Sequence, residues 1–222
     1  MKIIKGIFFL TALLLFNSLY AQDWPNLERY RGVNKKLKDS VVDVVYIGDS
    51  ITDFWVNKDS TFFKNNHYMD RGISGQTSPQ MLLRFRQDVI DLHPKSVVIL
   101  CGTNDIAGNT GPMTLEMSED NIRSMAELAK INKIKVILCS VLPSTHFGWS
   151  PDVQPADSIV KLNAWIKAYA KANHYGYVDY WDAMSDDNKG LKKELSKDGV
   201  HPNLDGYKVM EPLVQAAIKK VL

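Results

Sequence analysis

Hydrophobic residues along the chain form short apolar runs that alternate with longer segments of helical period. Five runs have the length and composition of buried strands: Val41–Ile47, the weaker His67–Arg71, Ser96–Cys101, Lys135–Leu142 and Tyr177–Tyr180. Short apolar runs that are separated by helices are typical of a parallel sheet. The pattern therefore predicts an α/β domain.

Between these runs, apolar residues recur at steps of three and four, the spacing that places them on one face of a helix. The four series are Leu82, Phe85, Val89 and Leu92; Ile122, Met125, Ala126 and Ala129; Ile159, Leu162, Ile166 and Tyr169; and Tyr207, Met210, Val214, Ala217 and Val221. Pro212 lies inside the last series, so we expect that helix to be kinked or to start later than the pattern suggests. The polar stretch Trp24–Asp39 is predicted to be helical in part.

Five strands that each lead into a helix or loop fit a flavodoxin-like order better than a barrel. The predicted fold is a three-layer αβα sandwich with a five-stranded parallel sheet. In such sheets the functional residues gather at the carboxyl ends of the strands, beside the point where the strand order reverses. This rule says where chemistry is to be sought, but not which chemistry it is.

The first 21 residues have the order of a secretory signal peptide. Two lysines precede an apolar run that only Thr11 interrupts, and Leu19-Tyr20-Ala21 then ends on a small residue at a suitable cleavage point. The run is shorter than the roughly 20 residues of a membrane span, and no cysteine follows it for lipid attachment. We therefore expect a signal peptide at 1–21, one domain at 22–222, and export to the periplasm or the extracellular space without stable membrane insertion. A retained N-terminal anchor is the alternative.

Charge argues against one broad class of partner. The two lysines of the predicted signal peptide account for the formal net charge of +2, so residues 22–222 carry as many acidic as basic side chains. Nucleic-acid-binding proteins normally carry a basic excess or stripe, so we expect no nucleic-acid partner. Cys101 and Cys139 lie at the ends of apolar runs and are expected to be two buried thiols, although an exported protein can keep a disulfide.

Small and polar residues follow three of the predicted strands. Ser50 lies at a strand-to-helix turn, where a hydroxyl can be exposed beside the unpaired N–H groups of a helix start. Gly75 can bring a bare backbone N–H close to an oxyanion, and the Asn104 amide is a neutral donor for the same purpose. Each signal is weak alone, because Asp, Ser and Asn are favoured in caps and loops, and glycine in turns.

The segment Asp198-Gly199-Val200-His201-Pro202 is more specific. A hydroxyl nucleophile needs a base, and the base needs a third group that holds it in the right tautomer. An acid and a histidine three residues apart can supply both from one short loop. We expect His201 to take the Ser50 proton and Asp198 to accept a hydrogen bond from the other ring nitrogen.

Together these segments resemble the SGNH/GDSL hydrolase family, over nearly the whole of residues 22–222. The four blocks that carry the resemblance are Gly48-Asp49-Ser50, Gly72 with Gly75, Gly102-x-Asn104-Asp105 and Asp198-x-x-His201. Ile51 stands where the family name has leucine, a small departure. The resemblance implies a triad of Ser50, Asp198 and His201. It also implies an oxyanion hole that is formed by the N–H groups of Ser50 and Gly75 and the Asn104 side chain.

The implied reaction is acyl transfer through an acyl-enzyme, with neither a metal nor an organic cofactor. Asp49, Asp53 and Asp105 suggest a metal site at first sight, but no acid–histidine ligand cluster accompanies them in the sequence. Metal-dependent phosphoester hydrolysis is one alternative to this reaction, and it predicts that chelation abolishes activity.

The sequence says least about the substrate. We expect Asp49, Trp55, Phe147 and Trp149 to contact it, because the loop at 142–151 should overhang the site, and aromatic rings suit both sugars and acyl chains. Phe54 and Trp181 are further candidates for aromatic walls.

Export, the absence of a long apolar lid helix and a resemblance to the acetylhydrolase-like branch favour a short acyl group, first of all an acetyl ester on a carbohydrate. One alternative is a lysophospholipase or thioesterase that acts on lipids with the same triad. Another is a non-catalytic binding module on the same fold.

Overall fold

The computed structural model describes residues 23–37 and 41–222, and the predicted signal peptide lies outside the described residues. Its centre is a five-stranded parallel sheet in the order β2-β1-β3-β4-β5. The strands are β1 (Val44–Gly48), β2 (Tyr68–Gly72), β3 (Ser96–Leu100), β4 (Lys135–Cys139) and β5 (Gly176–Val178). The strand order reverses between β1 and β3, as in the flavodoxin-like order that the sequence predicts.

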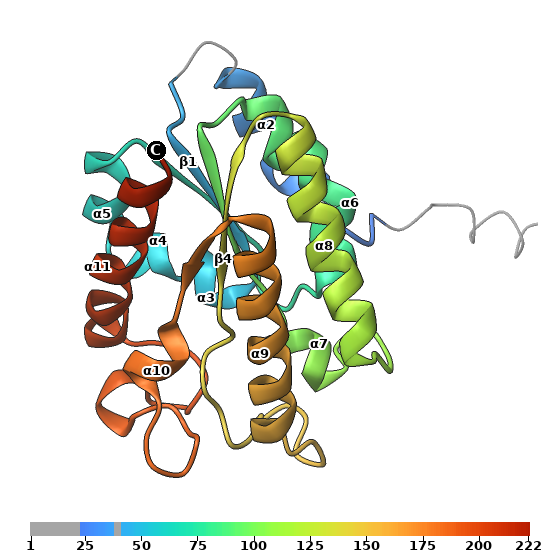
Figure 1. The fold of residues 1–222 in the computed structure, drawn as a ribbon, viewed down its shortest axis with the longest axis vertical. Helices are drawn as coiled ribbons and strands as arrows, with labels where there is room; N and C mark the ends of the chain where they lie inside the picture. The colour runs from blue at the N-terminus through green and yellow to red at the C-terminus, as the bar shows by residue number, and fades with distance from the viewer. Residues whose placement is uncertain (1–22, 38–40) are drawn as a thin grey trace, which may run out of the picture.

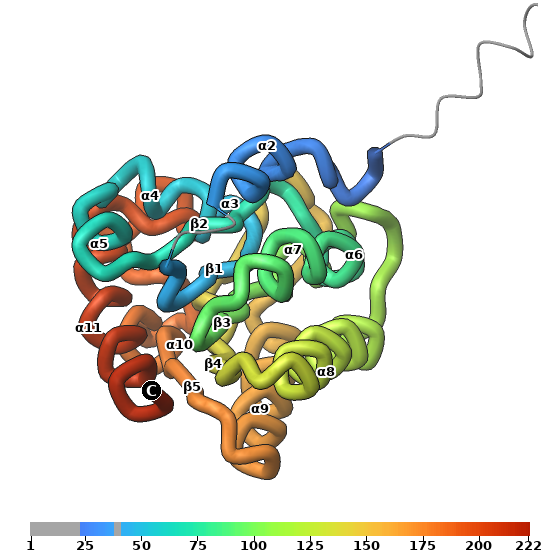
Figure 2. Tube along the Cα trace, turned by 90° about the horizontal axis from the view of Figure 1, so that it is seen from above, coloured from blue at the N-terminus to red at the C-terminus, as the bar shows by residue number. Residues whose placement is uncertain are grey.

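Helices cover both faces of the sheet, which confirms the αβα sandwich (Figure 1). One layer contains α6 (Ser78–Asp88), α8 (Leu115–Ile131) and α9 (Ala156–Asn173), with α2 (Glu28–Lys36) packed against α6. The other contains α4 (Trp55–Lys58), α5 (Ser60–Asn65) and α11 (Leu204–Val221). Short elements join the layers to the strands: α3 (Ser50–Asp53), η1 (Ile90–Leu92), α7 (Thr103–Ala107), α10 (Tyr180–Met184) and η2 (Lys193–Leu195). Figure 2 shows the same layers from above.

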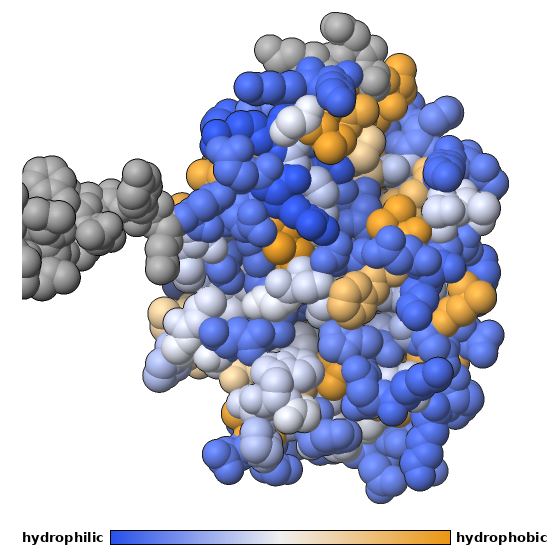
Figure 3. Space-filling view, turned by 180° about the vertical axis from the view of Figure 1, so that it is seen from behind, coloured by the Kyte–Doolittle hydropathy of each residue, from blue (hydrophilic) through white to orange (hydrophobic). Residues whose placement is uncertain are grey.

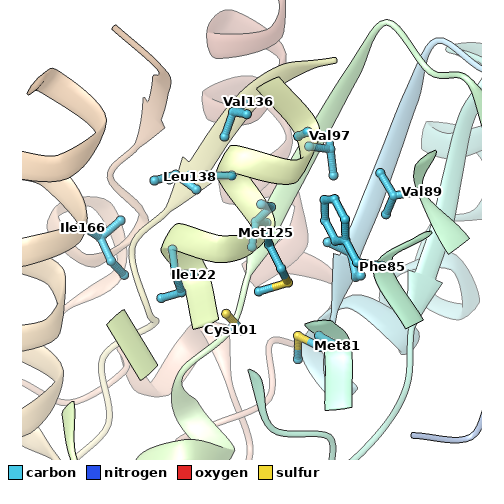
Figure 4. Close-up of a cluster of buried hydrophobic side chains, with 14 of the residues drawn as sticks. Met81, Phe85, Val89, Val97, Cys101, Ile122, Met125, Val136, Leu138 and Ile166 are labelled. Atoms are coloured by element: carbon cyan, nitrogen blue, oxygen red, sulfur yellow. The ribbon is translucent and has the colours of Figure 1, made fainter. Parts of the chain in front are cut away.

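Successive strand residues face opposite sides of the sheet and enter two separate cores. Val45 and Val97 belong to the core under α6, α8 and α9, where Figure 4 shows Phe85 and Met125 beside Val97. Val44 and Val98 belong to the core on the other face. There the cluster of Trp55, Phe62, Tyr207 and Met210 joins α4 and α5 to α11. Because the central strands β1 and β3 are buried on both faces along their whole length, their apolar runs in the sequence are continuous rather than alternating.

The structure confirms the predicted elements and corrects several of their bounds. The first run becomes a strand only from Val44, and the fourth ends at Cys139 rather than Leu142. Helix α11 runs through Pro212 and begins at Leu204, where the Asn203 side chain caps it by accepting the Gly206 N–H at 2.9 Å. The prediction that this helix starts later is therefore wrong.

Three strands end level at the carboxyl edge, because Gly48 is in register with Gly72 on one side and with Leu100 on the other. Helix α3 packs directly against the end of β2: a Cβ at position 72 would lie only 2.1 Å from the Asp53 nitrogen. Only glycine permits this approach. The loops that follow β1, β2 and β3 consequently start side by side.

The surface seen from behind is mainly polar, with hydrophobic residues in small separate groups (Figure 3). In the described part of the chain, no helix is long and apolar enough to cross a membrane.

Candidate active site

Ser50 is the first residue of α3, directly after β1. Asp49 caps this helix, because its Oδ1 accepts a hydrogen bond from the Ile51 N–H at 2.9 Å. The turn presents the Ser50 hydroxyl to His201, whose Nε2 lies 2.8 Å from Oγ. A base at hydrogen-bond distance is what an alcohol needs to become a nucleophile.

His201 and Asp198 lie on the loop between η2 and α11, where Nδ1 of the histidine is 2.7 Å from Oδ2 of the aspartate. The other oxygen, Oδ1, accepts the N–H groups of Val200 at 3.0 Å and His201 at 2.8 Å. Partial burial raises the pKa of Asp198, but the hydrogen bonds from the His201 side chain and from these backbone groups outweigh it, so the pKa lies well below its usual range. A charged Asp198 keeps the proton on Nδ1 and leaves Nε2 to accept one.

Ser196 fastens this loop, and sequence reasoning missed it. Its Oγ accepts the Gly199 N–H at 3.0 Å and lies 2.8 Å from the His201 carbonyl oxygen. Gly199 has a φ of +76°, which glycine adopts without steric cost. A serine two residues before Asp-Gly is a turn signal that points to such a contact.

Gly75 lies in the loop between β2 and α6, with a φ of +78°. No atom lies within 4 Å of the place that a Cβ would take, so the backbone conformation rather than a lack of space calls for glycine. The Gly75 N–H has no hydrogen-bond partner among the described residues. It is therefore available to a ligand in the adjoining cavity.

Asn104, in α7 after β3, contributes a buried side-chain amide. Its Nδ2 donates to the Gln76 carbonyl at 3.0 Å and lies 3.4 Å from Asp49 Oδ2. Its Oδ1 accepts a hydrogen bond from Asn109 Nδ2 at 2.9 Å. The NH₂ group is thus turned toward the loops that carry Ser50 and Gly75.

These groups line one cavity of about 270 Å³. Its lining residues are Ser50, Phe54, Ser74, Gly75, Asn104, Asn109, Trp149 and His201. The structure therefore brings the predicted nucleophile, base and two oxyanion donors together, with Asp198 behind His201. A hydroxyl, a base and amide donors around one small space can add an alcohol to a carbonyl and hold the charge that develops.

Two of the predicted aromatic contacts are wrong. Trp55 is only 1% exposed and stacks on Phe62 at 5.3 Å and Tyr207 at 5.2 Å, so it is part of the core. Phe147 is fully buried and stacks on the back of Trp149 at 5.1 Å. The aromatic rings that line the cavity are Trp149 and Phe54, whose ring lies 5.3 Å from that of His201.

Asp49 is also placed differently from the prediction. Its side chain is 1% exposed and does not line the cavity, so it does not contact a ligand there. Burial raises the pKa of Asp49 to about 6, against the lowering effect of the Ile51 N–H. Its contacts make it a support for α3 and a neighbour of the Asn104 amide.

The other two acidic residues near the site, Asp53 and Asp105, accept hydrogen bonds from the loop after β2 and from the first residue of α6. Asp53 Oδ2 accepts the Ser74 hydroxyl at 2.7 Å, and Asp105 Oδ2 accepts the Ser78 N–H at 3.0 Å. Across the described ranges, no group of three or more His, Cys, Asp and Glu side chains is arranged to hold a metal ion.

A buried arginine joins the strand ends beneath the site. Arg84 of α6 donates to the Gly48 carbonyl at 3.0 Å and to the Arg71 carbonyl at 2.8 Å, the ends of β1 and β2. It also donates to Gln76 Oε1 at 2.6 Å, in the loop that carries Gly75, and pairs with Asp88 at 3.2 Å. The pattern of hydrophobic positions gave no sign of it.

A second cavity of about 610 Å³ adjoins the acid of the triad. Asp198 and Gly199 line it, together with hydroxyl, imidazole and ammonium groups of Thr145, His146 and Lys197. Most of the residues that line it carry polar or charged side chains, and Leu191 contributes an apolar one.

Comparison with known proteins gives one family match. A sequence model of the GDSL-like lipase/acylhydrolase family matches residues 46–209, a span that contains Ser50, Gly75, Asn104, Asp198 and His201.

Solved structures agree with this match. A protein from Bacteroides fragilis NCTC 9343, described as a candidate acylhydrolase, has a TM-score of 0.87 at 51% identity, over 90% of this chain and 99% of its own. A GDSL-like lipase from Bacteroides thetaiotaomicron VPI-5482 has a TM-score of 0.84 at 50% identity, over 89% and 99%. An acetylxylan esterase from Geobacillus stearothermophilus shares the fold, with a TM-score of 0.66 at 21% identity over 80% and 94%.

Among curated proteins, the lipoprotein YqeF of Bacillus subtilis (strain 168) is 34% identical over 118 residues. The match covers 46% of this chain and 49% of that protein, so the chain matches about half the length of this relative.

Proposed function

The chain belongs to the GDSL-like lipase/acylhydrolase family, and from this premise we propose that Ser50, His201 and Asp198 are the catalytic triad of a serine esterase. The observation that carries the proposal is the line of two short contacts, 2.8 Å from Ser50 Oγ to His201 Nε2 and 2.7 Å from His201 Nδ1 to Asp198 Oδ2. Such a line delivers a hydroxyl proton to a base whose tautomer is fixed.

In the proposed reaction Ser50 Oγ attacks the ester carbonyl carbon while its proton passes to His201 Nε2. The Ser50 and Gly75 N–H groups and Asn104 Nδ2 hold the resulting oxyanion. His201 then protonates the leaving alcohol, which breaks the ester bond and leaves the acyl group on Ser50. Water attacks this acyl-enzyme by the same route, releasing the acid and restoring the serine.

We propose a short acyl group, first of all acetyl, on a carbohydrate acceptor. A cavity of about 270 Å³ beside Ser50 suits a small acyl group. The neighbouring cavity, lined by Thr145, His146 and Lys197, suits an acceptor rich in hydroxyl groups better than a lipid chain. The likeness of fold to an acetylxylan esterase is in keeping with this choice.

The test is hydrolysis of p-nitrophenyl acetate, butyrate and octanoate. We expect the acetate ester to be hydrolysed fastest, and Ser50→Ala to lower kcat by about 10⁴-fold or more, because the nucleophile is lost. Ser124→Ala, the same change on α8 and far from the cavity, is the matched control. Acetylated oligosaccharides would then identify the acceptor by the acetate that is released.

Other outcomes select the alternatives. Activity that peaks with octanoate would favour the lipid-directed hydrolase. Wild-type protein that is as inactive as Ser50→Ala on all esters, including acetylated sugars, would contradict the esterase and favour a binding module. Activity that vanishes in excess EDTA would favour metal-dependent hydrolysis.

We also propose that the protein is exported, with residues 1–21 as its signal peptide. The charged, apolar and small-residue order of this segment supports export, and the B. subtilis relative is named a lipoprotein. Fractionation of cells that express the full chain should place the protein in the periplasm or the medium, with a mature N-terminus near Gln22. Cytosolic protein that begins at residue 1 would contradict this.

A further inference from the structure

Asn109 lies between Trp149, which forms part of the aromatic wall of the cavity, and the loops that carry Gly75 and Asn104. These two residues are proposed to donate to the oxyanion together with Ser50. It follows α7, after Gly108 in a left-handed conformation, and is exposed in the cavity. Its side chain contacts three residues: Trp149, Asn104 and Gly75. None of these contacts belongs to the triad, and the resemblance assigns no role to this position.

The direction of each hydrogen bond follows from the indole. The Trp149 Nε1–H can only donate, and it lies 2.8 Å from Asn109 Oδ1. This contact fixes the orientation of the Asn109 amide, so its NH₂ faces the two acceptors on its other side. These are Asn104 Oδ1 at 2.9 Å and the Gly75 carbonyl at 3.1 Å.

The orientation of the Asn109 amide in turn determines the orientation of the Asn104 amide. Because Oδ1 of Asn104 accepts from Asn109, its NH₂ is turned toward the Gln76 carbonyl and Asp49 Oδ2 and hence toward the proposed oxyanion hole. In the reversed orientation Oδ1 would face two acceptors and repel an oxyanion. The three side chains thus form a one-way series of hydrogen bonds that begins at the wall of the cavity.

We propose that Asn109 is a positioning residue for this reaction: held by Trp149, it orients the Asn104 amide and fixes the Gly75 carbonyl. This inference rests on the proposed function of the site. The Gln76 carbonyl and Asp49 favour the same orientation of Asn104, so Asn109 adds to a preference rather than creating it. Loss of one such hydrogen bond should therefore cost about tenfold in kcat rather than the whole activity.

The test uses three variants on p-nitrophenyl acetate. Asn109→Asp keeps an acceptor for Trp149 but places a second oxygen against Asn104 Oδ1 and the Gly75 carbonyl. Asn109→Ala removes the contacts without adding charge. Trp149→Phe keeps an aromatic wall, although a smaller one, and removes the N–H donor. Asn132→Asp, at the end of α8, is the control for charge.

We expect kcat to fall about tenfold in both Asn109 variants and less in Trp149→Phe, with KM changed by less than about twofold. The double variant Asn109→Ala/Trp149→Phe should be no slower than Asn109→Ala, because both act through one series of contacts. The loss should be the same at every pH, whereas a charge effect on His201 would shift the pH profile of Asn109→Asp alone. Unchanged kcat, a change confined to KM, or additive losses would overturn the proposal.

A second readout does not depend on turnover. In ¹⁵N NMR spectra the Asn104 side-chain NH₂ signals should shift in Trp149→Phe, although among the described residues hydrogen bonds connect these two side chains only through Asn109. They should not shift in Asn132→Asp. If wild type hydrolyses no ester, the proposed function is contradicted. The NMR spectra still test the role of Asn109, because Asn104 signals that do not shift in Trp149→Phe would refute the positioning role.

Discussion

Asp49, Asp70 and Asp198 carry the same carboxyl group, and their surroundings give it three different acidities. Asp198 accepts hydrogen bonds from the His201 side chain and two backbone N–H groups, and its pKa is lowered. Asp49 is buried with one backbone donor, and burial raises its pKa to about 6. Burial raises the pKa of Asp70 on β2 to about 7, and its Oδ2 has no hydrogen-bond partner in the described part of the chain. The balance of burial against donors sets the order.

Asp70 should make stability depend on pH. Its pKa is raised in the folded state, so folding favours the protonated form, and stability falls as pH rises from about 4, the unfolded value, to about 7. Asp70→Asn keeps an acceptor for the Gly72 N–H, which lies 2.7 Å from Oδ1, and cannot ionise. We expect wild type to lose a few kcal/mol more than this variant between pH 4 and pH 8, measured by urea unfolding.

The exposed Asp91 provides the control, because Asp91→Asn changes a carboxylate that is in contact with solvent. Equal differences between wild type and Asp70→Asn at both pH values would show that Asp70 does not titrate on folding.

Sequence motifs selected side chains that the structure brings together, Ser50, Asp198 and His201, but described their surroundings less well. Ser50 could be found because it follows the end of a predicted strand, and His201 because it lies in an Asp-x-x-His segment. The predictions for Trp55 and Phe147 were wrong because an aromatic residue in a segment that follows a strand suits a cavity wall and a core equally, and only packing decides between the two. Asn109 was missed because its role lies in contacts with residues that are distant in sequence.

At the scale of elements, helix α6 joins the ends of β1 and β2 through one side chain. Arg84 is fully buried and donates to the Gly48 and Arg71 carbonyls, to Gln76 and to Asp88. Burial lowers the pKa of Arg84, and the Asp88 carboxylate opposes this change. The helix thus holds the turn before Ser50 and the loop of Gly75 from below.

Replacing Arg84 with Met should therefore cost more than packing alone. The change removes the buried charge partner of Asp88 and one donor from each of two buried carbonyl groups, and we expect a loss of about 3–5 kcal/mol in the free energy of unfolding. Arg86→Met, two residues along the same helix and exposed, should change stability by less than about 0.5 kcal/mol. Urea unfolding measures both, and equal losses would contradict the role of Arg84.

Element types were predictable here because the central strands β1 and β3 are buried on both faces and each long helix has one apolar stripe. The residues at which elements end were harder to predict. The run that continues to Leu142 leaves the sheet after Cys139, since β5 pairs only with Ile137–Cys139. Helix α11 tolerates Pro212 because its packing on the sheet, through residues such as Met210 and Val214, outweighs the lost hydrogen bond.

At the scale of the whole molecule, the sheet places its two cysteines deep between the layers. Cys101 follows β3 in one core and Cys139 ends β4 in the other, and both are free thiols. This agrees with the expectation of two buried thiols. Burial raises the pKa of Cys139 to about 12 and that of Cys101 well above its usual value, so neither forms the reactive thiolate at neutral pH.

Thiol reactivity should consequently report global unfolding. We expect no reaction of native protein with Ellman's reagent at pH 8, and reaction of both cysteines in concentrated urea. Rapid labelling of the native protein would show that one core opens locally. A titration of fewer than two thiols after unfolding would indicate a disulfide.

The spacing of the triad along the chain also has a consequence for biosynthesis. Ser50 and His201 are separated by 151 residues, and only the completed sheet and α11 bring their side chains together. During translation the Ser50 hydroxyl emerges early and stays an ordinary alcohol until residue 201 has been made and docked. We therefore expect a nascent chain to be inert toward esters, and the proposed hydrolysis to begin only when folding is complete.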